Sequence, residues 1–360
     1  FEGLPQTRPF ERTKAMLNLV CLIVLNLLLC AEVLGSDCSE KHQGVGVLIM
    51  AHGGDPKWNQ AVTEAVEPVG QLCPVEIAFG MAQRHSLAAA VADLDRKGVK
   101  RIAVVRIFVS PESFLHQTQY LLGLKPNPPP FFLHHGTQTG HSEVTHSNQH
   151  ASGGSEGRAP IWVGSGSDAP APIEMKAQVV LNREGHYDSP LIGQILEERI
   201  RTLSRQPEKE SVLILAHGEG DDERNQRWIS KLQALVRGMP GLDRYSAIRV
   251  ETLREDWEDK RALAEARIRG FVENQSRLGR VLVVPFRVFG FGPYSDVLEG
   301  LDHVATRQGL LPHPNVTEWI KTQASDCFSR AGWANPIAAA ADVSGSMLRS
   351  TDSPVSASRP

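Results

Sequence analysis

Two apolar runs of strand length end in the same dipeptide, His-Gly. The run VGVLIMAH at 45–52 precedes Gly53, and the run SVLILAH at 211–217 precedes Gly218. A continuously apolar run that leads into a helical pattern is typical of a strand buried on both faces of a parallel sheet. The pattern therefore predicts two equivalent strands, with a histidine at the carboxyl end of each.

The same order of elements follows each of these strands. The pattern predicts a helix (57–70 and 223–237), a second strand (74–79 and 247–253), a second helix (85–98 and 258–276) and an apolar third strand (101–109 and 280–289). Strands that alternate with helices form parallel sheets covered on both faces, and ligands bind beyond the carboxyl ends of their strands. We therefore expect an α/β fold with two repeated doubly wound parallel-sheet domains facing a central cleft.

Shifts in composition predict the domain limits. One α/β domain is expected at 44–125 and a second at 176–320, beginning with an amphipathic helix. Between them, prolines, glycines and histidines mark 126–175 as a Pro/Gly/His-rich linker. The tail at 334–360 is rich in Ala, Ser and Pro without periodic apolar positions, and is expected to be disordered.

A long apolar run at 17–34 follows Arg8, Arg12 and Lys14 and precedes small residues. This arrangement is typical of a signal peptide, which would place the protein outside the cytoplasm, in a periplasm or secreted. A membrane anchor is the alternative, because about 18 residues can just span a bilayer, and a buried helix is a third. Segment 1–36 is therefore predicted to be a signal peptide or an anchor. Contact with a membrane is expected only if 17–34 stays uncleaved, and a buried helix would leave the protein cytoplasmic.

Composition and charge exclude several classes of protein. The chain has 41% hydrophobic and 22% charged residues and a formal net charge of -3, as a globular protein does. A balance so near neutral gives no case for a nucleic-acid partner. The five cysteines form no CxxC pair, which argues against a zinc ribbon or a disulfide scaffold. No Walker or GxGxxG loop is present, so no nucleotide cofactor is expected; the oligomeric state stays open.

Polar side chains at the predicted strand ends suggest a metal site. His52 and His217 each end a first strand, where a neutral imidazole can bind a transition metal or accept a proton. Glu112 follows a third strand, and His116 lies four residues later on the same predicted helical face. These donors suit Fe(II), Co(II), Ni(II) or Zn(II). The structural alternatives are a satisfied histidine in a turn and a carboxylate that only stabilises a helix N-terminus.

Two further groups of side chains are candidates for supporting roles. Arg84, Arg106 and Arg287 lie at or near strand ends, where they could bind ligand carboxylates or form ordinary salt bridges. The histidines of the linker could bind accessory metal ions loosely. The alternative is a solvated polar linker whose histidines bind no metal. These histidines are His134, His135, His141, His146 and His150.

Several segments together carry a family resemblance. They are VLIMAHGG (47–54), VEIAFGMA (75–82), GVKRIAVVRIFVSPES (98–113), YLLGL (120–124), VLILAHG (212–218) and GRVLVVPFRVFGFGPYSDVLEGL (279–301). In this order they resemble the class II tetrapyrrole chelatases, nearest to the sirohydrochlorin cobaltochelatase family in its long two-domain, His-rich form, over roughly 44–320. The resemblance implies ATP-independent insertion of a divalent metal ion, cobalt or alternatively nickel or iron, into a sirohydrochlorin-type tetrapyrrole.

The resemblance also assigns roles by position. His52 matches the metal-binding histidine of the family, and Glu112 stands where many members have a second histidine. Met81 lies near the place of a missing glutamate of the second strand. Tyr294 replaces a histidine in the second half, which leaves His217 without an obvious partner. The resemblance thus implies His52 as metal ligand and Glu112 as ligand or proton acceptor.

A second hypothesis belongs to another class of function. A non-catalytic exported protein could bind or deliver metal through the linker histidines. The predicted export segment favours this hypothesis, because tetrapyrrole assembly is normally cytoplasmic. The repeated fold favours the chelatase instead.

Overall fold

The computed structural model describes residues 44–129 and 169–350, with side chains described as far as 343. All described residues except Gly44 belong to one compact unit of the chain. The apolar run at 17–34 and the five linker histidines lie outside the described residues. The signal segment and the accessory metal sites therefore stay predictions.

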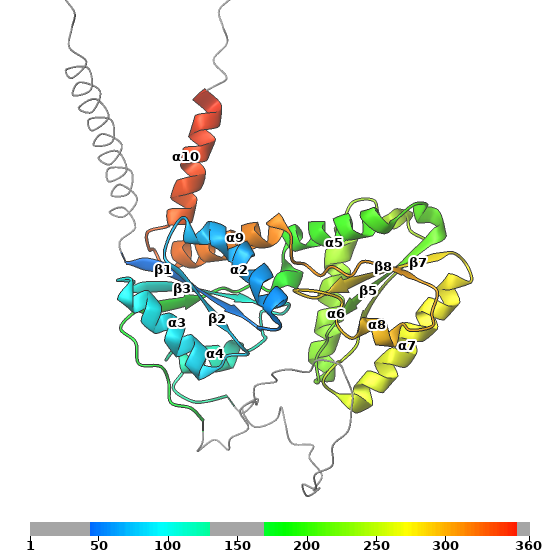
Figure 1. The fold of residues 1–360 in the computed structure, drawn as a ribbon, viewed down its shortest axis with the longest axis horizontal. Helices are drawn as coiled ribbons and strands as arrows, with labels where there is room; N and C mark the ends of the chain where they lie inside the picture. The colour runs from blue at the N-terminus through cyan, green and yellow to red at the C-terminus, as the bar shows by residue number, and fades with distance from the viewer. Residues whose placement is uncertain (1–43, 130–168, 351–360) are drawn as a thin grey trace, which may run out of the picture. The chain divides into compact units, whose positions relative to one another are not determined.

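Two four-stranded parallel sheets form the frame of the described chain (Figure 1). The first has the order β2-β1-β3-β4 and consists of β1 (Val45–Ala51), β2 (Val75–Phe79), β3 (Arg101–Ile107) and β4 (Gln178–Leu181). The second has the order β6-β5-β7-β8 and consists of β5 (Glu210–Ala216), β6 (Ala247–Thr252), β7 (Arg280–Phe286) and β8 (Val304–Ala305). The expected α/β fold with two repeated parallel sheets is confirmed.

The register of the strands brings their carboxyl ends to one level in each sheet. Ala51 of β1 pairs with Ile107 of β3, and Ala216 of β5 pairs with Phe286 of β7. His52 and the loop after β3 therefore leave the first sheet at the same edge. His217 and the loop after β7 do so in the second sheet.

The α-helices of the described chain are α2 (Pro56–Gly70), α3 (Arg84–Arg96), α4 (Leu115–Leu121), α5 (Pro190–Leu203), α6 (Asp222–Arg237), α7 (Glu258–Ser276), α8 (Tyr294–Val297), α9 (Pro314–Arg330) and α10 (Pro336–Ser350). Of these, α2, α3, α5, α6 and α7 lie where the apolar periodicity predicts a helix. The first helix of each half is capped in the same way. Asp55 accepts a hydrogen bond from the backbone N–H of Trp58, and Asp221 accepts one from that of Arg224. Such caps satisfy backbone donors that the helix itself leaves unpaired.

The central strands carry the hydrophobic core. Every residue of β1 and of β5 is buried, as expected for strands covered on both faces. One apolar cluster includes residues of β1, α2, α5, β5, β7 and α9, so it extends through both halves of the chain. The two repeats consequently share core residues rather than forming separate globules.

The predicted start of the second domain at 176 is wrong, because β4 belongs to the first sheet. Residues 178–181 pair in parallel with β3, from Arg101 opposite Gln178 to Val104 opposite Leu181. The short strand satisfies the open edge of β3, whose backbone groups would otherwise lack sheet partners.

The predicted end of the second domain at 320 also divides a helix that belongs to both halves. Helix α9 begins beside α5 and packs on α2, β3 and β4 of the first sheet. The hydroxyl of Thr317 donates a hydrogen bond to the Ala65 carbonyl (2.9 Å), and Arg330 Nη2 donates one to the Leu181 carbonyl (2.8 Å). The apolar face of the first sheet is thus covered by a helix that comes much later in the chain.

The tail predicted to be disordered from 334 is helical over most of its length. Helix α10 runs from Pro336 to Ser350, and the side-chain oxygen of Asn335 accepts a hydrogen bond from the Ala338 backbone (3.1 Å). Four consecutive alanines follow Ile337, and alanine has the highest intrinsic helix propensity. Residues 351–360 lie outside the described chain.

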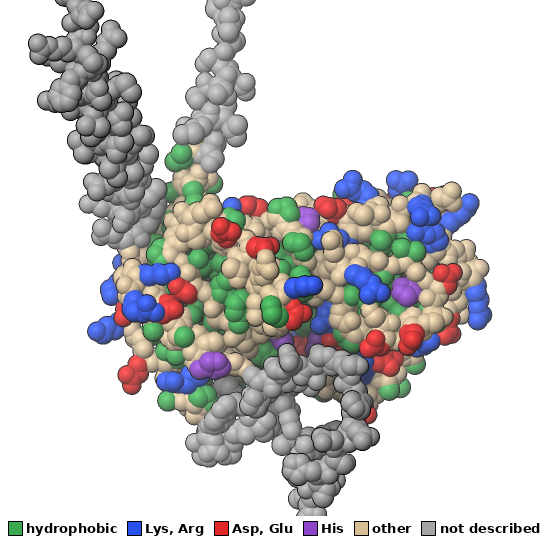
Figure 2. Space-filling view, in the orientation of Figure 1, with side chains coloured by type: hydrophobic (Ala, Val, Ile, Leu, Met, Phe, Trp, Pro, Cys, Tyr) green, Lys and Arg blue, Asp and Glu red, His purple; other side chains and the backbone are tan. Residues whose placement is uncertain are grey.

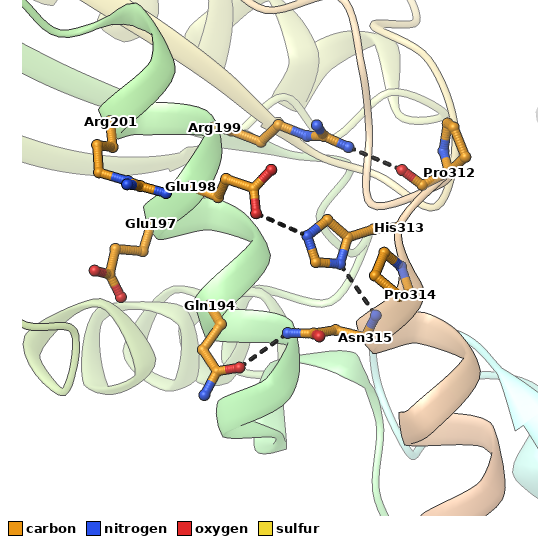
Figure 3. A pocket seen from close by; sticks show the side chains of 9 residues that line it. All are labelled: Gln194, Glu197, Glu198, Arg199, Arg201, Pro312, His313, Pro314 and Asn315. Carbon is orange, nitrogen blue, oxygen red and sulfur yellow. Dashed lines mark hydrogen bonds and ion pairs between the residues drawn. The ribbon is translucent and has the colours of Figure 1, made fainter.

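A polar pocket of about 600 Å³ marks the place where α5 and α9 meet (Figure 3). His313 Nδ1 accepts a hydrogen bond from the Asn315 backbone, so Nε2 carries the proton that it donates to Glu198 (3.1 Å). Asn315 donates to Gln194 (2.9 Å), and Arg199 donates to the Pro312 carbonyl (3.1 Å). These bonds hold the start of α9 on α5.

The surface carries charges of both signs. Figure 2 shows acidic and basic side chains intermixed over most of the visible face, with Lys and Arg gathered over the C-terminal end of α5. Within 44–129 and 169–350, no helix is both long enough and apolar enough to span a bilayer.

Candidate active site

A cavity of about 710 Å³ lies beyond the carboxyl ends of the strands of both sheets. Most of its wall is apolar and aromatic, and its polar residues come from the loops after β1, β3, β5, β6 and β7 and from α4 and α6. The aromatic residues are Trp58, Phe108, Phe114, Trp228, Trp257, Phe286 and Phe289. The ionisable residues are His52, Glu112, His116, His217, Glu219, Arg224, Asp256 and Arg287. A cavity with flat apolar walls and a few convergent polar groups is the usual form of a small-molecule site.

His52 presents one nitrogen that can bind a metal ion. Its Nδ1 donates a hydrogen bond to the Gly53 carbonyl (2.8 Å), so in the neutral ring Nε2 carries the lone pair. The left-handed backbone of Gly53 (φ 80°) makes this turn, and Trp58 lies 6.4 Å from the imidazole, centroid to centroid. The side chain is exposed, as an accessible ligand must be.

Glu112 lies in the turn between β3 and α4, not in a helix as predicted. The backbone N–H of Glu112 donates to the Ser110 hydroxyl (3.1 Å), and Phe114 has a left-handed φ of 53° that separates the turn from α4. Glu112 and His116 therefore do not share a helical face, although both line the cavity. Burial, Lys125 and Arg224 lower the pKa of His116, against a smaller opposing effect of Glu112.

The four predicted ligands do not form one metal centre. In the part of the chain that the structure describes, no three His, Cys, Asp or Glu side chains are placed to hold an ion together. His52, Glu112, His116 and His217 nevertheless line one cavity. The described part of the chain would thus offer an ion few ligands at this cavity.

His217 has partners that the sequence did not reveal. Its Nδ1 donates to the Gly218 carbonyl (2.9 Å), while Nε2 lies 3.2 Å from an oxygen of Asp256 and 4.0 Å from one of Glu255. Burial acts to lower the pKa of His217, but the hydrogen bond with Asp256 and the charge of Glu255 outweigh it and raise the pKa. Both nitrogens of the His217 ring thus face an oxygen, so neither is free for a metal ion while these contacts persist.

Tyr294 does not take the place of a ligand in the second half. Its side chain is fully buried in the core, 5.6 Å from the ring of Phe291. Arg287 lies over the Tyr294 ring at 5.6 Å and forms an ion pair with Glu255. The guanidinium of Arg287 therefore neutralises Glu255.

Two of the three arginines predicted to bind substrate have structural roles. Arg106 is 2% exposed and donates to the carbonyls of Ser113 (3.0 Å) and Asn182 (3.2 Å), and burial lowers its pKa to about 10. Arg84 donates to the Ala171 carbonyl (2.7 Å) and does not line the cavity. Arg287 lines the cavity, where it is paired with Glu255.

The sequence reasoning missed several cavity residues. Glu219, Asp256 and Trp257 lie in the loops after β5 and β6, so the rule that ligands bind beyond strand ends could have found them. Gly220 leaves room for the indole of Trp257, which a Cβ at that position would strike. Burial raises the pKa of Glu219, opposed by Arg224 and His217. Arg224 had no comparable signal, since the first turn of a helix is usually solvated.

Comparisons with known proteins agree with this fold. Residues 46–117 match the family model described as CbiX. The structure of SirB from Bacillus subtilis with Fe3+ superposes with a TM-score of 0.54 at 11% identity, over 81% of this chain and 100% of that chain. The sirohydrochlorin chelatase SirB from Bacillus subtilis subspecies spizizenii, in complex with cobalt, gives a TM-score of 0.49 at 10% identity, covering 81% and 99%. No curated protein sequence matches the chain.

These findings define the fold of the described chain. The described chain has a two-domain class II chelatase-like fold, and residues 46–117 carry the CbiX family pattern. The resemblance to the class II chelatases that the motifs predict is thus confirmed, whereas the cobalt-specific group and the His-rich form stay predictions.

Proposed function

We propose that this protein inserts a divalent metal ion into a metal-free sirohydrochlorin-type tetrapyrrole without ATP. The observation that carries the proposal is the cavity of about 710 Å³, which is lined by His52 with an accessible Nε2, by Glu112 and by several aromatic side chains. Cobalt is the first candidate metal because the motifs resemble those of the cobaltochelatases. Nickel and iron are alternatives, because nitrogen and carboxylate donors suit all three ions.

The reaction sets three physical requirements. One M²⁺ replaces two pyrrole N–H protons, so the protein must hold the ion, hold the ring and accept protons. His52 would bind the ion through a neutral imidazole, and Glu112 would add a negative charge. An ion held by so few protein ligands can be passed to the four nitrogens of a macrocycle.

The walls of the cavity suit a flat conjugated ring. Trp58 approaches from the first half, and Trp228 and Trp257 approach from the second. Aromatic faces bury a large apolar area and stack with little loss of side-chain entropy. Contacts on both sides could hold the ring in a bent shape that exposes its nitrogen lone pairs.

Carboxylates on both sides are available for the protons. Glu112 lies in the first half and Glu219 in the second, and both line the cavity. The raised pKa of Glu219 makes it a better proton acceptor near neutral pH than a solvated carboxylate.

An absorbance assay tests the proposal directly. Purified protein is mixed with sirohydrochlorin and Co(II), Ni(II) or Fe(II), and the spectrum is followed against a protein-free control. Faster insertion with protein supports a chelatase. An unchanged rate with metal retained on the protein would support the alternative, a non-catalytic metal-binding or metal-delivery protein.

The alternative depends on export. If 17–35 acts as a signal, the N-terminus of the mature protein should lie near Ser36 and the protein should be found outside the cytoplasm. An intact N-terminus in the cytoplasmic fraction would remove the reason for the alternative.

A further inference from the structure

Helix α6 turns three basic residues toward the first half of the chain. Arg224, Arg227 and Lys231 are three and four positions apart, which places them on one helical face. Arg224 lines the cavity. Lys231 Nζ lies 2.9 Å from Asp188 Oδ1, and Arg227 Nη2 lies 3.4 Å from Glu112 Oε2.

The pair between Arg227 and Glu112 engages a residue of the proposed reaction. Glu112 is 52% exposed and Arg227 is 46% exposed, and Arg227 also pairs with Glu223 (2.8 Å). A pair this exposed is weak, so another charged group can replace either member. While it persists, the guanidinium occupies an oxygen of Glu112 and repels a cation that approaches it.

The same guanidinium suits a carboxylate of the ligand. Arg106 is buried, Arg84 is bound to a backbone carbonyl outside the cavity, and Arg287 is held by Glu255. From α6, Arg224 lines the cavity, and Arg227 reaches the acidic cavity residue Glu112. Arginine binds carboxylates through paired hydrogen bonds, which favours an exchange of one carboxylate for another.

We propose that Arg227 is a positioning residue that couples binding of the macrocycle to binding of the metal. Before the macrocycle binds, Arg227 holds Glu112. A carboxylate of the incoming macrocycle takes over the guanidinium, and Glu112 is released to the metal ion. The nature of the macrocycle rests on the proposed function, whereas the pairing of Arg227 with Glu112 does not.

The test measures two affinities separately in the full chain. Co(II) binding is measured without tetrapyrrole by equilibrium dialysis, and sirohydrochlorin binding is measured without metal by quenching of tryptophan fluorescence. Arg227→Gln should raise the affinity for Co(II) by about two- to fivefold, because an exposed ion pair no longer competes for Glu112. It should lower the affinity for sirohydrochlorin by about tenfold, because a charge-assisted hydrogen bond is lost. Arg227→Lys should largely restore Co(II) binding to the parent value.

Three controls separate coupling from a merely structural role. Lys231→Gln removes the ion pair with Asp188 but leaves Glu112 paired, and Arg237→Gln removes an exposed charge from the same helix. Neither should change Co(II) binding. In a Glu112→Gln background, Arg227→Gln should no longer raise Co(II) affinity.

Two results would overturn the coupling: unchanged affinities in Arg227→Gln, or the same gain in Lys231→Gln. If Arg227→Gln changes both affinities as expected but the parent protein does not accelerate insertion, the chelatase function is refuted and the coupling stands.

Discussion

His52 and His217 end equivalent strands, yet their rings are chemically different. Both Nδ1 atoms donate to the next glycine carbonyl, but only His217 has carboxylates beside Nε2. The raised pKa of His217 favours its charged form, while His52 keeps an accessible nitrogen. The repeated fold therefore holds one histidine with an accessible nitrogen and one histidine with an oxygen at each ring nitrogen.

Replacing His52 by Ala should lower the rate of metal insertion by more than about tenfold, because the ion loses its nitrogen ligand. His217→Ala should have a smaller effect, since that ring is held by Asp256. Initial rates at fixed Co(II) and sirohydrochlorin measure both. His85→Ala is the control, as His85 is exposed on α3 and does not line the cavity. Equal losses of rate in His52→Ala and His217→Ala would refute the interpretation that only the first half holds the metal ion.

His186 should make stability depend on pH. It is fully buried, its ring lies 4.6 Å from Trp319, neither nitrogen has a hydrogen-bond partner among the described residues, and burial lowers its pKa to about 3. The unfolded chain takes up a proton below the ordinary pKa of 6.5, whereas the folded chain does not. Stability should therefore fall by about 1.4 kcal/mol per pH unit as pH drops from 6.5 toward 3.

The variant His186→Phe should remove this dependence. Relative to the parent protein, the free energy of unfolding measured by urea denaturation should increase by about 2 kcal/mol more at pH 5 than at pH 8. An identical gain at both values would show that His186 titrates normally.

Helix α9 depends on the junction with α5 for its first turn. His313 caps the helix through Nδ1 and pairs with Glu198 through Nε2 (Figure 3). His313→Ala should lower the free energy of unfolding by about 1–2 kcal/mol, because a cap and a hydrogen bond are lost. His313→Asn keeps a capping oxygen and should recover part of the loss. Denaturation midpoints of the three proteins measure this, and a neutral His313→Ala would contradict the role of the junction.

The two halves should not fold as separate domains. A fragment of residues 44–125 lacks β4 and α9, so one edge and one apolar face of its sheet would be exposed. We expect no cooperative thermal transition by circular dichroism for this fragment. A fragment of residues 45–343, which retains both elements, should unfold cooperatively. Cooperative unfolding of 44–125 would show that the shared core is dispensable.

The linker prediction concerns supply of metal rather than chemistry. Deleting 134–150 removes five histidines without touching His52 or Glu112. Histidines on the predicted Pro/Gly/His-rich linker would lose entropy on binding, so they should hold metal weakly and raise its local concentration. The deletion should slow insertion at limiting metal and leave the maximal rate intact, as measured by a metal titration of activity. A collapse of the rate at saturating metal would place a linker histidine in the active site.

The arrangement of the central elements could be predicted because it depends on local patterns. Continuous apolar runs predicted β1, β3, β5 and β7, and the predicted helix 258–276 coincides with α7. Strand β4 escaped notice because it is only four residues long, and α10 because alanines lack an apolar stripe. Short or featureless segments acquire their structure from a neighbour rather than from their own periodicity.

The sequence alone determined the repeated strands, the histidine at the end of each first strand, and the family pattern at 46–117. These properties reside in consecutive residues. Only the tertiary structure decided that Arg106 is buried, that Asp256 holds His217, and that Arg227 reaches Glu112. The physical reason is that the charge state and exposure of a polar side chain depend on partners brought near by folding, and those partners are distant in sequence.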